Sequence, residues 1–326
     1  MTSQMMHETI NVIVARKTLI AEDICLYELQ HEAPGTPLPD FEAGAHVDVH
    51  AGDFIRQYSL CGTPGPADSY QIAVLRDPAS RGGSHYMHDQ VQPGMRLRVS
   101  APRNLFPLHA AEPEDHSVLL AGGIGITPIL AMAEALHARG ASFELHYFSR
   151  SAARTAFRER LKECAFRECV HFHHDDDPAR SDLATVLGNA TRTAHLYFCG
   201  PGGFIDAIQQ TAVALQWDPA KVHFERFSAQ PVAGTGEDAA FTVRIASTGQ
   251  EVTVPADVSI TSALSDEGVV IPVACEQGVC GTCLTGVLEG DIDHRDQYLT
   301  DDERALNNQM TPCCSRARSG VLVLDL

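Results

Sequence analysis

The chain has 326 residues, enough for two or three domains, and its 44% hydrophobic and 20% charged residues are typical of a globular protein. No run approaches 18 uninterrupted apolar residues and the first eleven residues are polar, so the sequence predicts neither a membrane span nor a secretory signal. The formal net charge of −18 argues against nucleic acid or an anionic membrane as a partner.

Residues 1–105 contain short β-rich or alternating segments separated by turns rich in glycine and proline. Several strands at this spacing predict a closed antiparallel barrel. The expected strands are residues 11–15, 24–29, 46–50, 57–60, 71–75 and 96–100.

Two motifs stand out on this predicted barrel. The first, R-Q-Y-S-L at residues 56–60, places Arg56, Tyr58 and Leu60 on one face of a strand. The second, R-G-G-S at residues 81–84, precedes a short expected helix and could turn backbone N–H groups toward an anion. An ordinary strand and a plain turn would explain either motif alone. The pair, about 25 residues apart, predicts a mononucleotide whose ring and phosphate are held separately.

From residue 106 to 228 the pattern changes to alternating strands and helices. A strand at 117–121 runs into G-G-I-G-I-T-P (122–128) and then a helix that ends at Gly140, with Thr127 expected as its N-cap and Pro128 as its first residue. A second glycine loop, C-G-P-G-G (199–203), also follows a strand. Both loops fall at strand C-terminal ends, where open α/β sheets bind nucleotides, although the G-x-G-x-x-G fingerprint is absent. Further helices are expected at about 155–162, 182–187 and 204–217, with strands at 143–148, 170–173 and 195–199.

One strand end within this region is rich in metal-ligand residue types. His171, His173 and His174 are followed by three aspartates at 175–177. We favour an ordinary strand end followed by an acidic loop over a metal site here.

Residues 229–238 are rich in proline and glycine and predict an interdomain linker. The remainder, 239–326, predicts a small mixed sheet with one crossing helix: strands are expected at 241–246, 251–254, 284–289 and 321–324 and a helix at 261–267. From residue 238 onward there are 14 acidic residues against 5 arginines and no lysine. Such a surface either steers toward a basic partner or is simply solvated.

The most specific pattern lies in this last region. Cys275, Cys280 and Cys283 are spaced C-x4-C-x2-C, and Cys313 follows after 29 further residues. This spacing is typical of a plant-type [2Fe–2S] cluster, whereas structural zinc sites usually repeat C-x2-C twice. Spacing alone leaves open whether Cys313 or Cys314 is the fourth ligand. The other cysteines are scattered, which indicates a reducing cytosol and a cytoplasmic location.

These three regions together predict a redox circuit. NADH gives up two electrons as a hydride, but a [2Fe–2S] cluster accepts one. A flavin can take the pair and release the electrons singly. A mononucleotide-binding barrel, an α/β nucleotide domain and an iron–sulfur domain are therefore mutually consistent.

The order of the motifs R-x-Y-S, R-G-G-S, G-G-I-G-I-T-P, C-G-P and C-E-x-G-x-C-G-x-C resembles that of the phthalate dioxygenase reductase family, which includes vanillate demethylase reductase. The resemblance covers the chain beyond its first ten or so residues. It implies an FMN-binding β-barrel (1–105), a ferredoxin-reductase-type NAD-binding α/β domain (106–228), a linker (229–238) and a C-terminal plant-type ferredoxin domain of the β-grasp type (239–326).

The family implies that hydride passes from NADH to FMN and single electrons then pass through the cluster to a Rieske oxygenase that acts on aromatic carboxylates or methoxy-aromatics. No acid–base catalyst is implied, because the cofactors carry the chemistry. The alternatives are a reductase that serves a cytochrome P450 or a separate ferredoxin, and a cluster-based redox sensor. We expect a monomer that binds neither nucleic acid nor membrane.

The resemblance also implies site residues. Cys313 is the fourth cluster ligand in a pattern M-x-x-C-x-S-R-A, from which Cys314 departs at a position that is more often apolar. The residues implied to bind FMN are Arg56, Tyr58, Ser59, Ala73, Val74, Arg81, Gly82, Gly83, Ser84, Thr127, Phe227 and Ser228. Those implied to bind NAD are Gly122, Gly123, Gly125, Cys199, Gly200 and Pro201.

Overall fold

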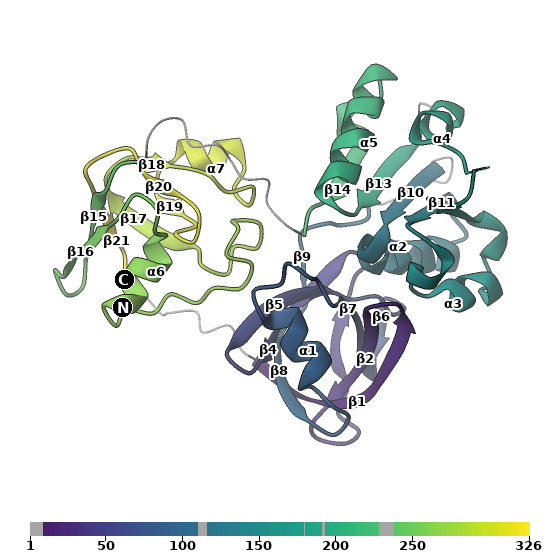
Figure 1. The fold of residues 1–326 in the computed structure, drawn as a ribbon, viewed down its shortest axis with the longest axis horizontal. Helices are drawn as coiled ribbons and strands as arrows, with labels where there is room; N and C mark the ends of the chain where they lie inside the picture. The colour runs from purple at the N-terminus through teal and green to yellow at the C-terminus, as the bar shows by residue number, and fades with distance from the viewer. Residues whose placement is uncertain (1–8, 110–115, 179, 191–192, 228–237) are drawn as a thin grey trace. The chain divides into compact units, whose positions relative to one another are not determined.

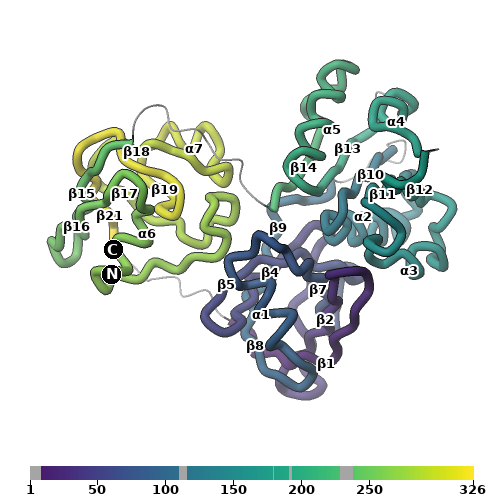
Figure 2. The backbone as a smooth tube through the Cα atoms, in the orientation of Figure 1, coloured from purple at the N-terminus to yellow at the C-terminus, as the bar shows by residue number. Residues whose placement is uncertain are grey.

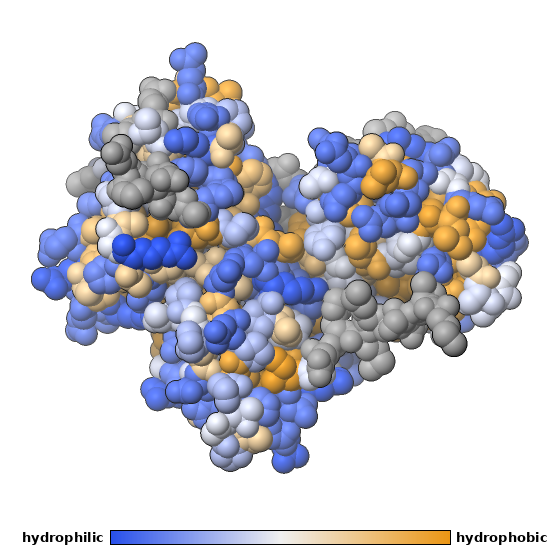
Figure 3. Space-filling model, turned by 180° about the vertical axis from the view of Figure 1, so that it is seen from behind, coloured by the Kyte–Doolittle hydropathy of each residue, from blue (hydrophilic) through white to orange (hydrophobic). Residues whose placement is uncertain are grey.

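The computed structural model describes residues 9–109, 116–178, 180–190, 193–227 and 238–326. The chain forms two compact units, Met1–Arg226 and Phe227–Leu326, and its path can be followed in Figures 1 and 2. Within the described ranges, no helix combines the length and the apolar character needed to cross a membrane. Hydrophilic and hydrophobic residues are interspersed on the face drawn in Figure 3.

The first unit begins with an antiparallel barrel. Its main sheet has the strand order β5-β4-β8-β1-β2-β7, with β9 paired to β4, and β3 and β6 form a separate ribbon. Past the end of β5, Leu60 bridges to Ile72 of β7, and the Cys61 N–H donates to the Gln71 carbonyl at 2.9 Å, which closes the barrel. Its elements are β1 (Thr9–Ala21), β2 (Ile24–His31), β3 (Leu38–Phe41), β4 (Ala45–Ala51), β5 (Phe54–Ser59), β6 (Gly65–Ala67), β7 (Ser69–Leu75), α1 (Gly83–Asp89), β8 (Arg96–Ser100) and β9 (Arg103–Asn104).

The barrel interior is built from alternate residues of these strands. Val12 and Val14 of β1, for example, are fully buried while their neighbours face outward. β-branched residues at alternate positions pack well on a pleated surface, which explains both the strand and the choice of inward face.

The second half of this unit is a five-stranded parallel sheet in the order β12-β11-β10-β13-β14. One hydrophobic core lies between the sheet and α2 and α3, and another lies between the opposite face and α4 and α5, so the sheet is covered on both sides. The elements are β10 (His116–Gly122), η1 (Gly123–Gly125), α2 (Ile126–Ala138), β11 (Ser142–Ser149), η2 (Ala152–Arg154), α3 (Arg158–Glu163), η3 (Arg167–Cys169), β12 (Val170–His174), α4 (Leu183–Asn189), β13 (His195–Cys199), α5 (Gly202–Ala214), η4 (Pro219–Lys221) and β14 (Val222–Glu225).

The core beneath α2 also includes barrel residues. Ala43, Cys61, Ala73 and Phe106 are buried in the same cluster as the side chains of α2. The barrel and the parallel sheet therefore share apolar contacts and form one compact unit.

The second unit is a mixed sheet in the order β16-β15-β21-β17-β19 with a small β18–β20 pair. Ile260, Ala263 and Leu264 of α6 pack into its core, as predicted for a single crossing helix. The elements are β15 (Phe241–Ile245), β16 (Glu251–Val254), α6 (Ile260–Asp266), β17 (Thr285–Glu289), β18 (Ile292–Asp293), α7 (Asp301–Ala305), β19 (Gln309–Met310), β20 (Arg316–Ala317) and β21 (Val321–Leu324).

Two details of the predicted helices are wrong. The helix expected from residue 155 begins at Arg158, because Phe157 has a φ of 58° and interrupts the helical backbone. Thr127 does not cap α2, whose N-cap is Gly125; instead the Thr127 hydroxyl donates to the Ile124 carbonyl at 3.0 Å from within the first turn. A threonine side chain can bond to a nearby backbone carbonyl in this way instead of capping a helix N-terminus.

Candidate functional site

The two barrel motifs meet in space. A Cβ atom at Gly83 would lie 2.7 Å from Cγ of Arg56, so the glycine is what allows the Arg56 side chain to cross this loop. At Gly82, which has a φ of 95°, a Cβ atom would lie 2.6 Å from the ring of Phe54. The R-x-Y-S strand and the R-G-G-S loop, distant in sequence, therefore form one surface.

The helix that follows the loop is oriented for an anion. The first turn of α1 has no acidic residue, and the Ser84 hydroxyl accepts a hydrogen bond from the Asp77 N–H at 3.2 Å. At the other end, the Lys17 ammonium donates to the carbonyls of His88 (2.5 Å) and Val91 (2.9 Å), where a cation complements the helix dipole. The loop and first turn, Arg81 to Ser84, could hold a phosphate.

The structure places the other predicted flavin residues in several different environments. Tyr58 packs against the barrel core, and its burial raises the pKa of its hydroxyl. Ala73 is buried in the core under α2, and Val74, next on β7, points into the barrel. Thr127 is 2% exposed. Phe227 is exposed and belongs to the second unit, and Ser228 lies outside the described residues.

The two glycine loops of the parallel sheet also meet. A Cβ atom at Gly125 would lie 2.2 Å from the carbonyl oxygen of Cys199, and one at Gly200 would lie 3.0 Å from Cα of Gly122. Only glycine permits this approach of two backbones. The first turns of α2 and α5 contain no acidic residue, so both helix N-termini, at the carboxyl ends of β10 and β13, suit an anionic dinucleotide.

A residue that the sequence reasoning missed completes this region. Glu225, the last residue of β14, accepts a hydrogen bond from Ser59, and its other carboxylate oxygen is buried without a hydrogen-bond partner in the described structure. Burial raises the pKa of Glu225 to about 8. Burial, together with the Glu225 charge, keeps the pKa of the Cys199 thiol well above its usual value.

Ser59, Cys199 and Glu225 thus bring a hydroxyl, a neutral thiol and a carboxyl from three strands to one place. Cys199 was predicted because ligands gather at the carboxyl ends of parallel strands, and the same rule applies to β14, the fifth strand of this sheet. Applying it there would have found Glu225.

The cysteine motif forms a loop in the second unit. The Cys275 thiol contacts those of Cys280 and Cys313, and Cys313 also contacts Cys283. Cys280, Cys283 and Cys313 are buried. Backbone N–H groups of Gln277 and Thr282 point at the sulfurs of Cys275 (3.3 Å) and Cys280 (3.5 Å). Four converging sulfurs with N–H donors fit a [2Fe–2S] cluster.

The structure brings Cys313, and not Cys314, into contact with the motif cysteines. Cys314 contacts Cys313 and the hydroxyls of Thr311 (3.3 Å) and Ser315 (3.9 Å). Its sulfur lies where a Cβ atom on Gly278 would be only 2.4 Å away, and Gly278 has a φ of 73°. Cys314 therefore fills space behind the loop.

Comparisons with known proteins place the chain among oxygenase reductases. Residues 243–318 match the family model of the 2Fe-2S iron-sulfur cluster binding domain, and residues 104–222 match that of the dimethylamine monooxygenase subunit DmmA-like N-terminal domain. The vanillate O-demethylase oxidoreductase of Pseudomonas sp. (strain HR199 / DSM 7063) is 51% identical over 320 residues, which are 97% of this chain and 100% of the relative. The carnitine monooxygenase reductase subunit of Escherichia coli (strain K12) is 40% identical over 96% of this chain and 94% of the relative.

Several solved structures match nearly the whole chain, and two of them represent different systems. Phthalate dioxygenase reductase superimposes with a TM-score of 0.74 at 40% identity and covers 98% of both chains. An intact type IV self-sufficient cytochrome P450 monooxygenase gives a TM-score of 0.81 at 38% identity, where this chain corresponds to 41% of that longer chain.

The fold and the cluster-binding domain define a flavin- and NADH-dependent iron–sulfur oxidoreductase. The chain belongs to the phthalate dioxygenase reductase-like family, the reductase components of oxygenase systems. The predicted family, fold class and reductase function are confirmed, as are a [2Fe–2S] cluster, a flavin and NADH as cofactors.

Proposed function

We propose that this chain is the reductase of a Rieske-type oxygenase or demethylase that acts on a methoxylated aromatic acid. The observation that most supports this is the 51% identity with a vanillate O-demethylase oxidoreductase over 97% of the chain. The oxygenase would select the aromatic substrate, and this chain would supply it with electrons one at a time.

The proposed flavin is FMN. A bound flavin takes two electrons as a hydride and releases them singly. Arg81, Gly82, Gly83 and Ser84 would bind its single phosphate with the N–H groups that begin α1, supported by the absence of acid in that turn. The residues proposed to hold the ring are Arg56, Tyr58, Ser59, Ala73, Val74, Thr127, Phe227 and Ser228. Flavin released by heat and identified by mass spectrometry tests this, and FAD would refute it.

The proposed NADH site is the junction of the two glycine loops. Gly122, Gly123 and Gly125 would cradle the pyrophosphate, and Cys199, Gly200 and Pro201 would lie beside the nicotinamide. The close approach of Gly125 to Cys199 supports this, because it leaves N–H groups on one shared surface. Ser59 and Glu225 would exclude water from the nicotinamide and orient it.

The proposed ligands of the cluster are Cys275, Cys280, Cys283 and Cys313. Three variants test this and the electron route. Cys280→Ser and Cys313→Ser should lose the visible absorption of the cluster and the reduction of cytochrome c, yet still reduce flavin with NADH. Cys314→Ser is the matched control and should keep all three properties. Undiminished cytochrome c reduction by Cys280→Ser would contradict the electron route. Loss of the cluster in Cys314→Ser but not in Cys313→Ser would show that Cys314, and not Cys313, is the fourth ligand.

An oxygenase that contains haem, such as a cytochrome P450, is the second candidate acceptor. It is supported by the likeness to a self-sufficient cytochrome P450 over 98% of this chain and by 42% identity to a heme-dependent oxidative N-demethylase beta subunit. Reconstitution with a purified vanillate demethylase oxygenase and with a purified P450 haem domain separates the two. We expect NADH-supported product only with the first.

We further propose the domain limits 1–105, 106–228 and 239–326 with a linker at 229–238. Limited proteolysis should cut first within the linker. A cytoplasmic location is supported by the ten cysteines, none of which is in a disulfide in the described structure. A monomer is proposed, and size-exclusion chromatography with light scattering tests it.

A further inference from the structure

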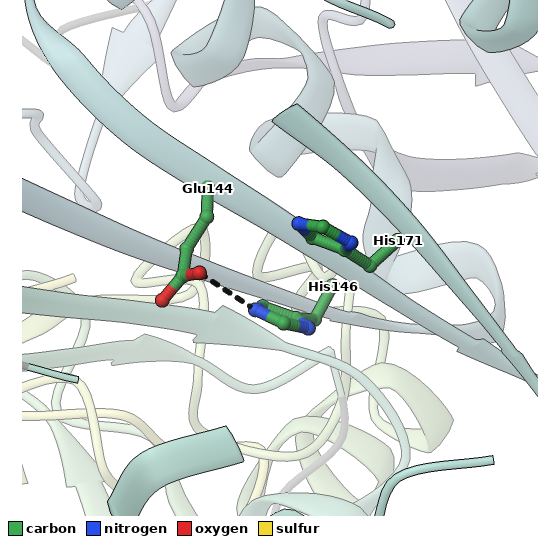
Figure 4. A group of neighbouring side chains, drawn as sticks. All are labelled: Glu144, His146 and His171. Atoms are coloured by element: carbon green, nitrogen blue, oxygen red, sulfur yellow. Dashed lines mark ion pairs between the residues drawn. The ribbon is translucent and has the colours of Figure 1, made fainter. Parts of the chain in front are cut away.

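A group of metal-ligand side chains lies on the α/β sheet, apart from the nucleotide loops. Glu144 and His146 are on β11 and His171 is on β12, where it pairs in register with His146. One ligand atom from each residue, a carboxylate oxygen of Glu144 and one ring nitrogen of each histidine, lies within 4.8 Å of the other two. Figure 4 shows the three side chains converging from the two neighbouring strands.

The group consists of electron-pair donors that face each other. The Glu144 Oε2 atom is 3.3 Å from Nε2 of His146, and that nitrogen is buried without a hydrogen-bond partner of good geometry in the described structure. The rings of His146 and His171 lie 4.8 Å apart. A carboxylate and two imidazoles gathered this closely are stabilised by a cation held between them.

Neighbouring side chains orient the ligands. Nδ1 of His146 is 3.0 Å from Nε2 of the buried His173. If Nδ1–H donates to His173, the lone pair of His146 Nε2 points toward Glu144 and His171. A second imidazole, His116, lies with Nε2 3.8 Å from the other Glu144 oxygen and is itself fixed by Ser142 at 2.8 Å. Such supporting contacts are typical of metal-binding histidines and carboxylates.

We propose that Glu144, His146 and His171 bind one Zn²⁺ ion, with water as the fourth ligand. Two imidazoles and a carboxylate are a usual zinc ligand set. Tetrahedral bonds of about 2.0–2.1 Å place ligand atoms roughly 3.4 Å apart. His171 is exposed and can close the remaining gap by rotating its side chain.

The position of the site indicates its role. β12 is an edge strand of the sheet, and the ligands are the third and fifth residues of β11 and the second residue of β12, whereas the glycine loops follow the carboxyl ends of β10 and β13. The ion would fasten the edge strand to its neighbour. It would take no part in hydride transfer, so this inference does not depend on the proposed function.

The sequence draws attention to His171, His173, His174 and the aspartates at 175–177, for which we favoured an ordinary strand end. The converging group instead combines His171 with Glu144 and His146 of the adjacent strand. Only the parallel register of β11 and β12 brings these residues together.

The test uses the full-length holoprotein after a chelator has removed bound metal ions. The visible spectrum is first used to check that the cluster and the flavin are intact, and ZnCl₂ is then titrated in by calorimetry. We expect one site in the wild type and a zinc-dependent rise in thermal unfolding midpoint. His171→Gln should weaken that site by about 100-fold or more, and His173→Asn by about 10–100-fold. His137→Gln is the matched control, because His137 is an exposed histidine on α2 of the same domain.

Either of two results would overturn the proposal. One is a wild type that takes up no zinc at millimolar concentration. The other is a His171→Gln variant that titrates as the wild type does. His171 is exposed, so its replacement should leave the fold intact, and Glu144→Gln provides a second variant that removes a different ligand.

Discussion

Glu225 shows how one carboxyl can change the chemistry of a junction. It is the last residue of β14, it accepts a hydrogen bond from Ser59, and burial raises its pKa to about 8, so it is mostly neutral at pH 7. Above pH 8 a negative charge would appear beside Cys199 and the residues proposed to hold flavin and nicotinamide. That charge would repel the electron-rich ring of reduced nicotinamide. The folded state would then no longer contain a neutral carboxyl at this buried position.

We predict that Glu225→Gln flattens the dependence of stability on pH. The carboxyl has a pKa of about 8 in the folded chain against a usual value of 4.5, so the folded state holds a proton that the unfolded state loses. Stability is therefore expected to fall as pH rises from about 4.5 to about 8, and glutamine removes this contribution. Thermal unfolding midpoints at pH 5.5, 7 and 8.5 measure it. Glu251→Gln, at an exposed position on β16, is the control; equal slopes in the wild type and Glu225→Gln would refute the assignment.

At the scale of elements, the contact between η1 and the end of β13 is set by one glycine. A Cβ atom at Gly125 would meet the Cys199 carbonyl at 2.2 Å and the Gly200 nitrogen at 2.6 Å, and backbone cannot move aside as a flexible side chain can. The two glycine loops would have to separate.

We predict that Gly125→Ala lowers stability by about 1–3 kcal/mol, as overpacking does, and raises KM for NADH. Gly188→Ala is the matched control, because Gly188 lies in α4 with nothing within 4 Å of its would-be Cβ atom. It should gain up to about 1 kcal/mol from helix propensity and leave KM unchanged. Urea unfolding measures the stability of both variants, and steady-state kinetics measure their KM for NADH. An unaltered KM in Gly125→Ala would show that NADH binding does not depend on the contact at Gly125.

Patterns of a few residues predicted elements well and contacts poorly. Alternating and helical periodicities located the strands and helices, and cysteine spacing located the cluster loop, because these signals are local. The start of α3 depends on a positive φ at Phe157, and the loss of the Thr127 cap depends on how η1 enters α2. The meeting of Ser59 with Glu225, and of Glu144 with His171, requires strand order and register, which no local pattern encodes.

At the scale of the whole molecule, charge is concentrated beside the cluster loop. The described chain from Asp238 has 14 acidic residues against 5 arginines. The first turn of α7 carries Asp301, Asp302 and Glu303, and Asp301 is 98% exposed. Arg304 ties this helix to the carbonyl of Asp296 at 2.6 Å, and Asp296 packs against Gly278 of the cluster loop. An acidic helix end therefore lies next to the point where electrons would leave.

We predict that the oxygenase docks at this loop through a basic surface, so that electron transfer slows as salt increases. Asp301→Asn combined with Asp302→Asn should reduce the second-order rate at low ionic strength roughly two- to tenfold and flatten its salt dependence, because steering charge is lost. Glu251→Gln combined with Asp257→Asn removes the same charge from exposed positions on β16 and the turn after it, so it is the matched control. Stopped-flow oxidation of the NADH-reduced protein by the oxygenase across a salt series measures both. If the two double variants slow equally, only net charge matters; if neither rate depends on salt, the acidity of this unit plays no part in docking.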